Sequence, residues 1–398
     1  MRLLHTADWH LGRTLEGRSR AEEQEAVLNE ICTVAEEEAV DAVLMAGDVF
    51  DTVNPPAASE ALFYETAERL SASGRRPLLI IAGNHDSPDR LQAASPLADR
   101  QGITIIGRPL PLPRRFVLPR TGESLTVAFV PYPSEARLND CLSASGAEEL
   151  LQRAYQERLT GLFYAQSRYF SKQAVSVLLT HLFVGGSQET ESERPIQVGG
   201  AYTVDRGCFP PQTQYVALGH LHRAQTLSRA SVPTRYAGAP LAYSFSEAGQ
   251  EKSVTIIDVA PGGVPAIRAV PLHAGRRLVR WRAEHGSAEV LRWIEAGRDE
   301  GAWIDLEIRL KEAMTMHDIQ KLRSANPLLV NIRPIYEAEQ RNSMCAQHPL
   351  PIDELFVEFY RRQTGGADPG SGLVRLFMQL LEEAPAEEEA GGACDETD

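Results

Sequence analysis

The sequence predicts an α/β protein with buried parallel strands, and two observations support this. Short apolar runs such as residues 42–46 and 77–82 are bounded by turn formers and show no alternation of polar and apolar residues. Such runs are typical of strands that are covered on both faces. Between the runs, residues 27–35 and 62–70 carry apolar side chains at the three- and four-residue spacing of a helix with one buried face. This alternation of strands and helices favours a sheet with helices on its surface.

Side chains suited to metal binding or proton transfer follow five of the predicted strands. They are Asp8 and His10 after residues 2–7, Asp48 after 42–46, Asn84, His85 and Asp86 after 77–82, His181 after 175–180, and His220 and His222 after 215–218. We expect them to lie close together, because open α/β sheets bind ligands at the carboxyl ends of their strands. Asp8 and His10 are two residues apart, and an extended backbone would point both to one side. Five such endings indicate one site.

Each of these residues also has an ordinary interpretation. An aspartate such as Asp8 or Asp48 can cap the following helix, and a lone histidine at the end of a strand is more often a satisfied polar residue. The tetrapeptide at 83–86 is by itself typical of a turn. Half of the ten histidines fall in the strand endings, and we interpret the others as structural or surface residues: His5, His273, His285, His317 and His348.

The endings follow one another as Asp-x-His, Gly-Asp, Gly-Asn-His-Asp, a lone His and Gly-His-x-His. This ordered set resembles the pattern of the calcineurin-like metallophosphoesterases. Within that superfamily, residues 5–12, 47–51 and 219–222 are similar to the SbcD subunits of bacterial SbcCD nucleases. The resemblance is strong over residues 1–272 and weakens beyond them. Asp51 departs from it, because archaeal and eukaryotic relatives commonly place a histidine there.

The resemblance implies an αββα sandwich that holds two divalent metal ions, with manganese favoured. It assigns the first ion to Asp8, His10, Asp48 and His222, and the second to Asp48, Asn84, His181 and His220, so that Asp48 bridges them. Mixed imidazole, carboxylate and amide ligands suit manganese, iron or zinc. Two ions about 3.5–4 Å apart can stabilise both the attacking and the leaving oxygen of a phosphoryl displacement. In this interpretation His85 is a catalytic residue that protonates the leaving oxygen or positions the phosphate, and Asp86 holds the tautomer of His85.

The sequence after residue 275 predicts smaller parts. Residues 304–310 alternate apolar and polar side chains, as a half-buried strand does, and Thr315 with Asp318 resembles a capping box. The resemblance makes this region a small α+β capping domain that contacts DNA. We expect a catalytic domain at 1–275, a capping domain at 276–342, a helical partner-binding segment at 343–383 and a disordered acidic tail at 384–398.

The partner-binding segment carries two amphipathic patterns, at 352–360 and 373–381, separated by a Gly-rich stretch that cannot continue a helix. Each predicted helix is too short to be stable alone in water, so its apolar face must be buried against something. The pattern alone slightly favours packing against residues 276–340. The resemblance favours a different partner, because in that family a C-terminal helical pair binds the coiled coil of the SbcC ATPase. We therefore expect residues 352–381 to bind such an ATPase.

Composition restricts the cellular setting. A formal net charge of −14 argues against binding DNA over the whole surface. Basic residues stand beside the predicted site, where they either attract a polyanion locally or form a solvated face: Arg13, Arg18, Arg20 and Arg90. Five cysteines without a Cys-x-x-Cys pair fit a reducing cytoplasm, and no apolar stretch is long enough to span a membrane. The resemblance also implies a homodimer, for which 57–71 and 90–99 are candidate helices, although their stripes could simply cover the sheet.

Three classes of function are compatible with these features. The first is a metal-dependent DNA nuclease subunit, acting as an exonuclease on double strands and as an endonuclease on single strands or hairpins, with an SbcC-type ATPase. The second is a stand-alone phosphodiesterase or phosphatase on nucleotides or small phosphoesters, which would share every metal ligand. The third is a non-catalytic scaffold, which is disfavoured because no predicted ligand is missing and His85 is present. The accessory regions favour the nuclease, since a small-molecule hydrolase needs neither of them.

Overall fold

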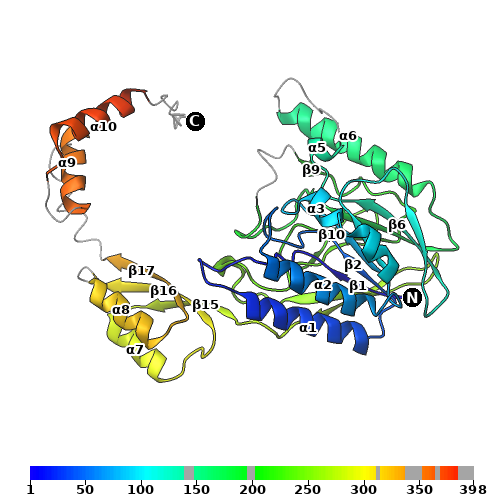
Figure 1. Cartoon of the computed structure of the whole chain (residues 1–398), viewed down its shortest axis with the longest axis horizontal. Helices are drawn as coiled ribbons and strands as arrows, with labels where there is room; N and C mark the ends of the chain where they lie inside the picture. The colour runs from blue at the N-terminus through cyan, green and yellow to red at the C-terminus, as the bar shows by residue number, and fades with distance from the viewer. Residues whose placement is uncertain (139–147, 195–201, 311–313, 337–351, 364–367, 384–398) are drawn as a thin grey trace, which may run out of the picture. The chain divides into compact units, whose positions relative to one another are not determined.

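The computed structural model describes residues 1–138, 148–194, 202–310, 314–336, 352–363 and 368–383. These residues belong to two compact units (Figure 1). The first unit comprises Met1–Arg309 and Met314–Pro334, and the second contains the two C-terminal helices. The predicted acidic tail at 384–398 lies outside the described residues. Among the described helices, none is both long and apolar enough to cross a membrane.

The first sheet has six strands in the order β14-β13-β1-β2-β3-β4. Their bounds are Arg2–Thr6 for β1, Ala42–Met45 for β2, Leu78–Ile81 for β3, Ile103–Ile106 for β4, Ser253–Asp258 for β13 and Ala266–Pro271 for β14. Strands β1 to β4 are parallel, whereas β13 and β14 each run antiparallel to their neighbour. The loops that follow β1, β2 and β3 therefore leave the sheet at the same edge.

The second sheet also has six strands, in the order β11-β12-β10-β7-β6-β5. Their bounds are Arg114–Val117 for β5, Ser124–Val130 for β6, Val175–His181 for β7, Tyr215–Gly219 for β10, Gln225–Thr226 for β11 and Thr234–Tyr236 for β12. The four central strands are parallel, and the two edge strands β5 and β11 are antiparallel to their neighbours. The residues that follow β7 and β10 thus share one edge as well.

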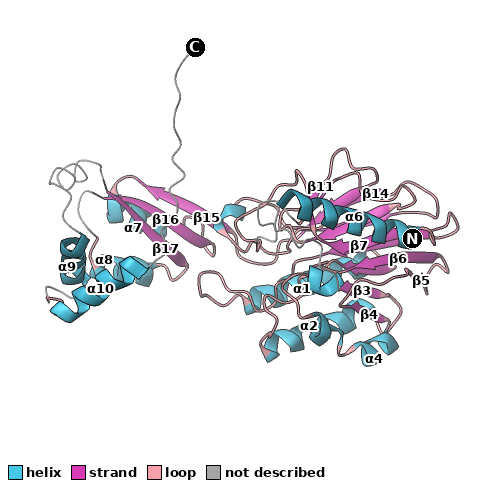
Figure 2. Ribbon diagram, turned by 90° about the horizontal axis from the view of Figure 1, so that it is seen from above, coloured by secondary structure: helices cyan, strands magenta, loops and turns pink. Residues whose placement is uncertain are grey.

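The two sheets stack face to face, with helices on the outside (Figure 2). Alternate residues of the strands fill the space between them, for example Leu44 and Leu79 from the first sheet and Val127 and Val177 from the second. Helices α1 (Ala21–Glu37) and α2 (Ala57–Ser71) pack on the outer face of the first sheet, and α6 (Glu148–Ser167) packs on that of the second. The predicted αββα sandwich is therefore confirmed.

The predicted helical stripes are buried in these outer layers. Ile31 and Phe63, which represent the stripes of α1 and α2, are 0% and 1% exposed. In α6, by contrast, Leu150 lies in the first turn and is 55% exposed. The short remaining elements of the sandwich are α3 (Pro88–Gln92), α4 (Ser95–Ala98), η1 (Asp99–Gln101), α5 (Glu135–Leu138), β8 (Phe183–Val184), β9 (Thr203–Val204) and η2 (Phe245–Glu247).

A small three-stranded sheet follows the sandwich and contains β15 (Leu278–Ala283), β16 (Trp303–Leu310) and β17 (Leu329–Tyr336). Helices α7 (Gly286–Glu295) and α8 (Met316–Ala325) belong to the same region. The capping box predicted for Thr315 and Asp318 is confirmed, because each side chain bonds the backbone N–H of the other. The strand predicted at 304–310 is confirmed as part of β16, but Asp305 on its expected polar face is buried, where it pairs with Arg280 and Arg333.

The C-terminal unit consists of α9 (Ile352–Gln363) and α10 (Ser371–Glu383) in the described residues. The two helices pack through Phe356 and Phe377, whose rings stack with centroids 4.1 Å apart. Leu355 and Leu376 remain 50% and 51% exposed. Two amphipathic helices are thus present where the sequence predicts them, and they leave apolar surface uncovered within this unit.

Candidate metal centre

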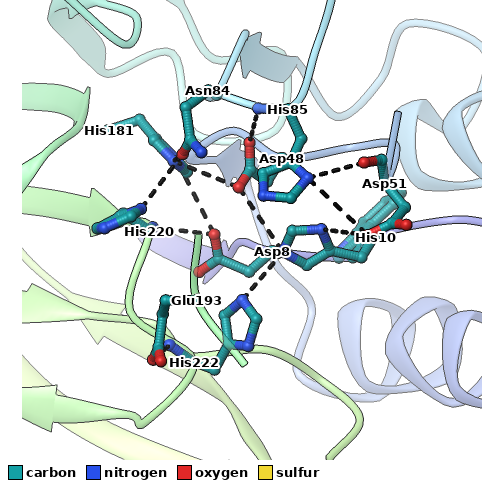
Figure 3. A network of polar contacts seen from close by, with 12 residues as sticks. Asp8, His10, Asp48, Asp51, Asn84, His85, His181, Glu193, His220 and His222 are labelled. Atoms are coloured by element: carbon teal, nitrogen blue, oxygen red, sulfur yellow. Dashed lines mark hydrogen bonds and ion pairs between the residues drawn. The ribbon is translucent and has the colours of Figure 1, made fainter. Parts of the chain in front are cut away.

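The predicted site residues converge where the two sheets meet (Figure 3). The loops after β1, β2 and β3 supply the ligands of the first sheet, namely Asp8, His10, Asp48 and Asn84, together with His85. The second sheet supplies His181 at the end of β7, and His220 and His222 after β10. All of these side chains are buried except that of Asn84, which is half-buried. The side chains of the five strand endings thus lie close together, as the sequence leads us to expect.

The backbone around Asp8 and His10 differs from the predicted extended chain. Strand β1 ends at Thr6, and φ is +55° at Asp8, +45° at His10 and +52° at Asp48. Left-handed conformations of non-glycine residues cost about 1–3 kcal/mol each and persist only where the surroundings enforce them. Here the loops support one another: the N–H of Asp8 donates to the carbonyl of Gly47, and the N–H of His10 to that of Asp48, each at 3.0 Å. The side chains of Asp8, His10 and Asp48 are therefore oriented by tertiary hydrogen bonds rather than by strand geometry.

Two glycines allow the loops to approach this closely. A Cβ atom at Gly83 would lie 2.1 Å from the Oδ1 atom of Asp48, and one at Gly219 would lie 2.0 Å from the carbonyl oxygen of Ala46. No side chain larger than hydrogen can occupy either place without moving a loop. The glycines that precede Asn84 and His220 are thus required for the two sheets to bring their ligands together.

Asp48 lies at the centre of the cluster. Its Oδ2 atom is 3.6 Å from the Nε2 atom of His10 and 3.5 Å from the Nε2 atom of His181. Its Oδ1 atom accepts a hydrogen bond of 2.9 Å from the N–H of His85. The Nε2 atoms of His10 and His222 are 2.9 Å apart on one side of it. This placement between two groups of donors is the one that a bridging carboxylate requires.

On the other side of Asp48, two electron-pair donors face each other. His181 donates from Nδ1 to the carbonyl of Ala46 at 2.8 Å, so in the neutral ring its Nε2 atom carries a lone pair. That Nε2 atom is 2.8 Å from the Oδ1 atom of Asn84, which is also an acceptor, and the Nδ1 atom of His220 lies 3.2 Å from the same oxygen. The Oδ2 atom of Asp8 is buried and has no hydrogen-bond partner among the described residues. Lone pairs that meet in this way are satisfied by a cation.

The pKa values of the cluster also favour a bound cation. Burial lowers the pKa of His10 to about 3 and lowers the pKa values of His181 and His220, so that these rings are neutral, as metal ligands must be. Burial and the neighbouring carboxylate of Asp48 raise the pKa of Asp8. Burial would also raise the pKa of Asp48, but a protonated His181 or His10 ring, with the backbone N–H of His85, lowers it overall. A divalent cation would allow both carboxylates to stay ionised.

These donors fit a dinuclear centre. Two groups of side chains, His10 with Asp48 and His85, and Asp8 with Asp48 and His181, each have their potential ligand atoms within 4.8 Å of one another. Both groups contain Asp48, as the predicted bridge requires. Imidazole, carboxylate and amide donors together suit a divalent transition metal rather than calcium.

Comparisons with known proteins agree with this geometry. The family model described as calcineurin-like phosphoesterase matches residues 1–224. The SbcD subunit of the SbcCD nuclease of Bacillus subtilis (strain 168) is 50% identical over 382 residues, which are 96% of this chain and 97% of that protein. The SbcD subunits of Rhodobacter capsulatus and Escherichia coli (strain K12) are 34% and 28% identical, over 79% and 91% of this chain and 82% and 92% of their own.

The chain belongs to the SbcD family of calcineurin-like phosphoesterases. The resemblance drawn from the five motifs is therefore confirmed, and with it the prediction that the chain is a hydrolytic enzyme.

Within this family site, Asp86 does not perform the task predicted for it. Its two carboxylate oxygens accept hydrogen bonds from the backbone N–H groups of Val49 at 3.2 Å, Phe50 at 3.0 Å and Gly83 at 2.8 Å. The Nδ1 atom of His85 instead lies 2.7 Å from the carbonyl oxygen of Asp51. The prediction that Asp86 holds the tautomer of His85 is wrong, because the Asp86 oxygens are already used to join the loop after β3 to the loop after β2.

Asp51 is therefore a member of the site that motif matching did not assign. Its carbonyl orients His85, and its Oδ1 atom is 3.5 Å from the Nδ1 atom of His10 and 3.7 Å from the Nη1 atom of Arg13. Asp51, Arg13 and His85 line a hollow of about 450 Å³ beside the metal ligands. The signal that could have found Asp51 is its position at the end of the loop that begins with the motif Gly47-Asp48.

Three of the four predicted basic residues have clearly different environments. Arg13 lines the hollow, and its Nη2 atom donates to the carbonyl of Ser192 at 2.7 Å. Arg90 is exposed and pairs with Glu60 at 3.0 Å. Arg20 is only 2% exposed, because it pairs with Glu23 at 2.6 Å inside the protein. Neither interpretation offered for Arg20, attraction of a polyanion or a solvated face, is correct.

Proposed function

We propose that this chain is the catalytic subunit of an SbcCD-type nuclease, which cuts DNA together with an SbcC-type ATPase in repair and recombination. One observation carries the proposal: a full set of dimetal donors converges in a chain that is 50% identical, over 96% of its length, to a protein named as a nuclease subunit. The proposed activities are exonuclease cleavage of double strands and endonuclease cleavage of single strands or hairpins. The proposed compartment is the reducing cytoplasm, which suits five cysteines without a Cys-x-x-Cys pair.

The proposed metals are two manganese ions. Asp8, His10, Asp48 and His222 would hold the first, and Asp48, Asn84, His181 and His220 the second. Two divalent cations in such a site activate a water molecule and offset the charge of a phosphodiester during an in-line displacement. The chain's own contribution is the rigid placement of these donors by the loop contacts described above.

His85 is the proposed proton donor. The Asp51 carbonyl fixes Nδ1, so that Nε2 is the ring nitrogen left for the substrate. The side chain is buried but lines the hollow beside the ligands, where the sugar oxygen released from a cleaved phosphodiester would need a proton. Because the carbonyl of Asp51 accepts from Nδ1–H in both the neutral and the charged ring, the ring keeps its orientation as the proton is transferred. Asp86 is a positioning residue in this scheme, because it joins the loops that carry Asp48 and His85.

The surroundings of the site support a polyanionic substrate. Arg13 and Arg194 both line the 450 Å³ hollow, together with Thr14 and Thr52, and these side chains can donate hydrogen bonds to phosphate oxygens. The carboxylates of Asp51, Glu191 and Glu193 line the same hollow, so the bound cations would supply the remaining positive charge for a phosphate. We propose that a DNA strand enters through this hollow, with residues 276–342 acting as a capping domain that contacts the DNA.

The test of the proposed function compares two substrate classes. Purified protein with manganese should cut single-stranded DNA more efficiently than it hydrolyses nucleotide phosphomonoesters, and a chelator should abolish both activities. Faster turnover of the small phosphoesters would favour the alternative of a stand-alone phosphatase or phosphodiesterase. Residues outside the catalytic region support the nuclease, since a hydrolase of small phosphoesters does not need them.

The proposed ATPase-binding surface is the exposed apolar face of α9 and α10, within residues 352–381. Leu355 and Leu376 are half exposed there, although the two helices already pack on each other through Phe356 and Phe377.

Removing all residues after 345 should abolish co-purification with the SbcC-type ATPase while leaving manganese-dependent cleavage of single strands in place. Leu376→Glu should weaken the same interaction without truncation. Full binding by both variants would remove this assignment.

A homodimer through residues 57–71 and 90–99 is also proposed. Helix α2 exposes Tyr64 (47%), and the short helix α4 exposes Leu97 (71%). Single exposed apolar side chains are common on protein surfaces, so the proposal requires these two to belong to one contact surface. Leu97→Glu should convert a dimer into a monomer in light scattering, with the metal content unchanged.

A further inference from the structure

A chain of hydrogen bonds, which we call the His222 relay, leads away from His222 on the side opposite to the metal donors. The Oγ atom of Ser192 is 2.6 Å from the Nδ1 atom of His222 and 2.7 Å from the Oε1 atom of Glu247. The three residues Ser192, His222 and Glu247 are 4%, 1% and 1% exposed, so water does not compete for these contacts. Ser192 and Glu247 come from segments that none of the five motifs contains.

The direction of the two hydrogen bonds follows from their last member. An ionised carboxylate can only accept, so the contact with Glu247 requires the Ser192 hydroxyl as its donor. The Oγ1 atom of Thr190 also lies 2.7 Å from the Oγ atom of Ser192, and with the serine proton directed to Glu247 the Thr190 hydroxyl is the donor of that contact. The Oγ atom of Ser192 must then accept from His222, which requires the proton of the neutral ring to be on Nδ1. The Nε2 atom of His222 is consequently the atom with the free lone pair, and it is the atom that lies 2.9 Å from Nε2 of His10. The His222 relay thus selects the tautomer that can bind a cation.

Glu247 is held in place as an anion. Its Oε2 atom pairs with the ammonium group of Lys252, and its Oε1 atom accepts from the backbone N–H groups of Tyr243 at 2.9 Å and Ser244 at 3.1 Å. Lys252 also donates to the carbonyl of His222 at 3.1 Å, so the same cation touches both ends of the relay. A carboxylate with these partners has a fixed position and a fixed charge.

The loop that carries Ser192 is joined to the His222 backbone by a separate contact. Glu193 accepts from the N–H of His222 at 2.8 Å with Oε1, and from the N–H of Thr190 at 2.7 Å with Oε2. If the Ser192 hydroxyl were removed, the contacts of Glu193 would therefore still hold the loop against the backbone of His222. This separation allows the tautomer of the ring to be tested without moving the ring.

We propose that Ser192 and Glu247 are positioning residues for metal binding: they hold His222 as the Nδ1–H tautomer and so present its Nε2 atom to a divalent cation. The inference rests on the proposed dimetal centre and extends it to two residues outside the family motifs. Partners of this kind around a metal-binding histidine affect metal affinity by about 10–100-fold. Their effect is on one of the two cations, because His222 belongs to the first ligand group alone.

The experiment measures manganese binding, not only cleavage. Ser192→Ala removes the acceptor for Nδ1–H. Ser167→Ala is the matched control, since Ser167 is also 4% exposed and its hydroxyl donates to the carbonyl of Tyr164 at 2.9 Å, outside the relay. Titration calorimetry with manganese should give one site weakened by about 10–100-fold in Ser192→Ala and two unchanged sites in the control. Nitrogen-15 NMR of histidine-labelled, metal-free protein should show His222 protonated on Nδ1 in the wild type and a mixture of tautomers in Ser192→Ala.

Two failures can be distinguished. Wild-type protein that binds no manganese would overturn the proposed dimetal centre itself. A wild type with two sites and a Ser192→Ala variant with the same two affinities would overturn the relay alone, as would a wild-type His222 protonated on Nε2. A thermal shift in metal-free Ser192→Ala without any change in manganese affinity would mean that the serine is structural, and it would also overturn the proposal.

Discussion

Two of the buried charge clusters in the first unit differ in how their charge is balanced. Arg20 and Glu23, 2% and 8% exposed, form a pair with Nε to Oε1 at 2.6 Å and Nη2 to Oε2 at 2.9 Å. Glu23 also accepts from the indole N–H of Trp303 at 2.9 Å and from the backbone N–H of Arg276 at 2.6 Å. In the metal centre, by contrast, no Lys or Arg among the described residues pairs with Asp8 or Asp48. That cluster is complete only with ions from outside.

The difference separates a structural role from a functional one. Burying a charge is costly unless the charge is paired, so an unpaired cluster persists only where a ligand completes it. The paired cluster joins α1 to the small sheet, because Glu23 lies in the first turn of the helix and Trp303 begins β16. Substitutions in the metal centre should therefore act on metal binding and catalysis, whereas substitutions at the Arg20–Glu23 pair should act on stability alone.

The largest effect is expected for Asp48→Ala. This variant removes the carboxylate that both donor groups share, so both ions should be lost together and hydrolysis of DNA should fall to background. Elemental analysis of manganese-loaded protein measures the first outcome, and a nuclease assay measures the second. Asp89→Ala, which removes an exposed carboxylate paired with Arg108, is the matched control and should keep two ions. Two fully occupied sites in Asp48→Ala would contradict the bridging role.

A smaller effect on catalysis is expected for His85→Ala. The variant should keep both ions yet lose about 10²–10⁴-fold in turnover, the usual contribution of a proton donor. The exposed His273 provides the control, because His273→Ala changes a histidine that has no place in the site. Undiminished turnover would reassign the proton transfer, and loss of a metal ion would make His85 a ligand.

Manganese itself should stabilise the protein, since it supplies the positive charge that balances the ionised carboxylates of Asp8 and Asp48. At a free concentration 100 times the dissociation constant, a bound ligand adds about 2.7 kcal/mol to the free energy of unfolding. Thermal unfolding with and without manganese should show this as a higher Tm for the wild type. The shift should vanish in Asp48→Ala and persist in Glu23→Gln, and an equal shift in both variants would argue that manganese binds elsewhere.

The proposed metal ligands could be predicted from the sequence because each one stands at the end of a strand or in the first few residues after it. Predicting His181 and His220 requires no knowledge of tertiary contacts. It is enough to recognise a buried apolar run and the edge of the sheet at which that strand ends. The layers of the sandwich were predictable for a related reason: the stripe around Ile31 has a helical period that is visible locally. Both signals are contained within a few consecutive residues.

The rest depends on partners far apart in the chain. Strand β1 was expected to continue to His10, but loop contacts with Gly47 and Asp48 turn the backbone after Thr6. Arg20 lies in a stretch whose composition is typical of an exposed basic loop. Its environment is nevertheless set by Glu23, which accepts a hydrogen bond from Trp303, 280 positions away. Asp51 ends the phrase that begins with Gly47-Asp48, but its role depends on contacts with His85 and His10 that no local pattern shows. Glu247 follows no period and no motif, so nothing in the sequence alone distinguishes it from other acidic residues.

The smallest effect is expected for Glu23→Gln, and it should depend on pH. Burial would raise the pKa of Glu23, but the hydrogen bond and charge of Arg20, with the N–H groups of Arg276 and Trp303, lower it overall. A lowered folded-state pKa means that the ionised group stabilises the fold fully above the pKa of the unfolded chain, about 4.3, and that this contribution is lost as the pH falls through the folded-state value. At neutral pH, Glu23→Gln should therefore reduce the free energy of unfolding by about 1–2 kcal/mol, since glutamine can still accept one hydrogen bond. The difference in the free energy of unfolding between Glu23→Gln and the wild type should disappear in acid below that range.

Urea unfolding of the metal-free protein at neutral and at acid pH measures this difference, with the exposed Glu25→Gln as a neutral control. A difference that stayed constant into acid would assign the stability to packing around Trp303, and a change in manganese affinity would remove the contrast between the two clusters.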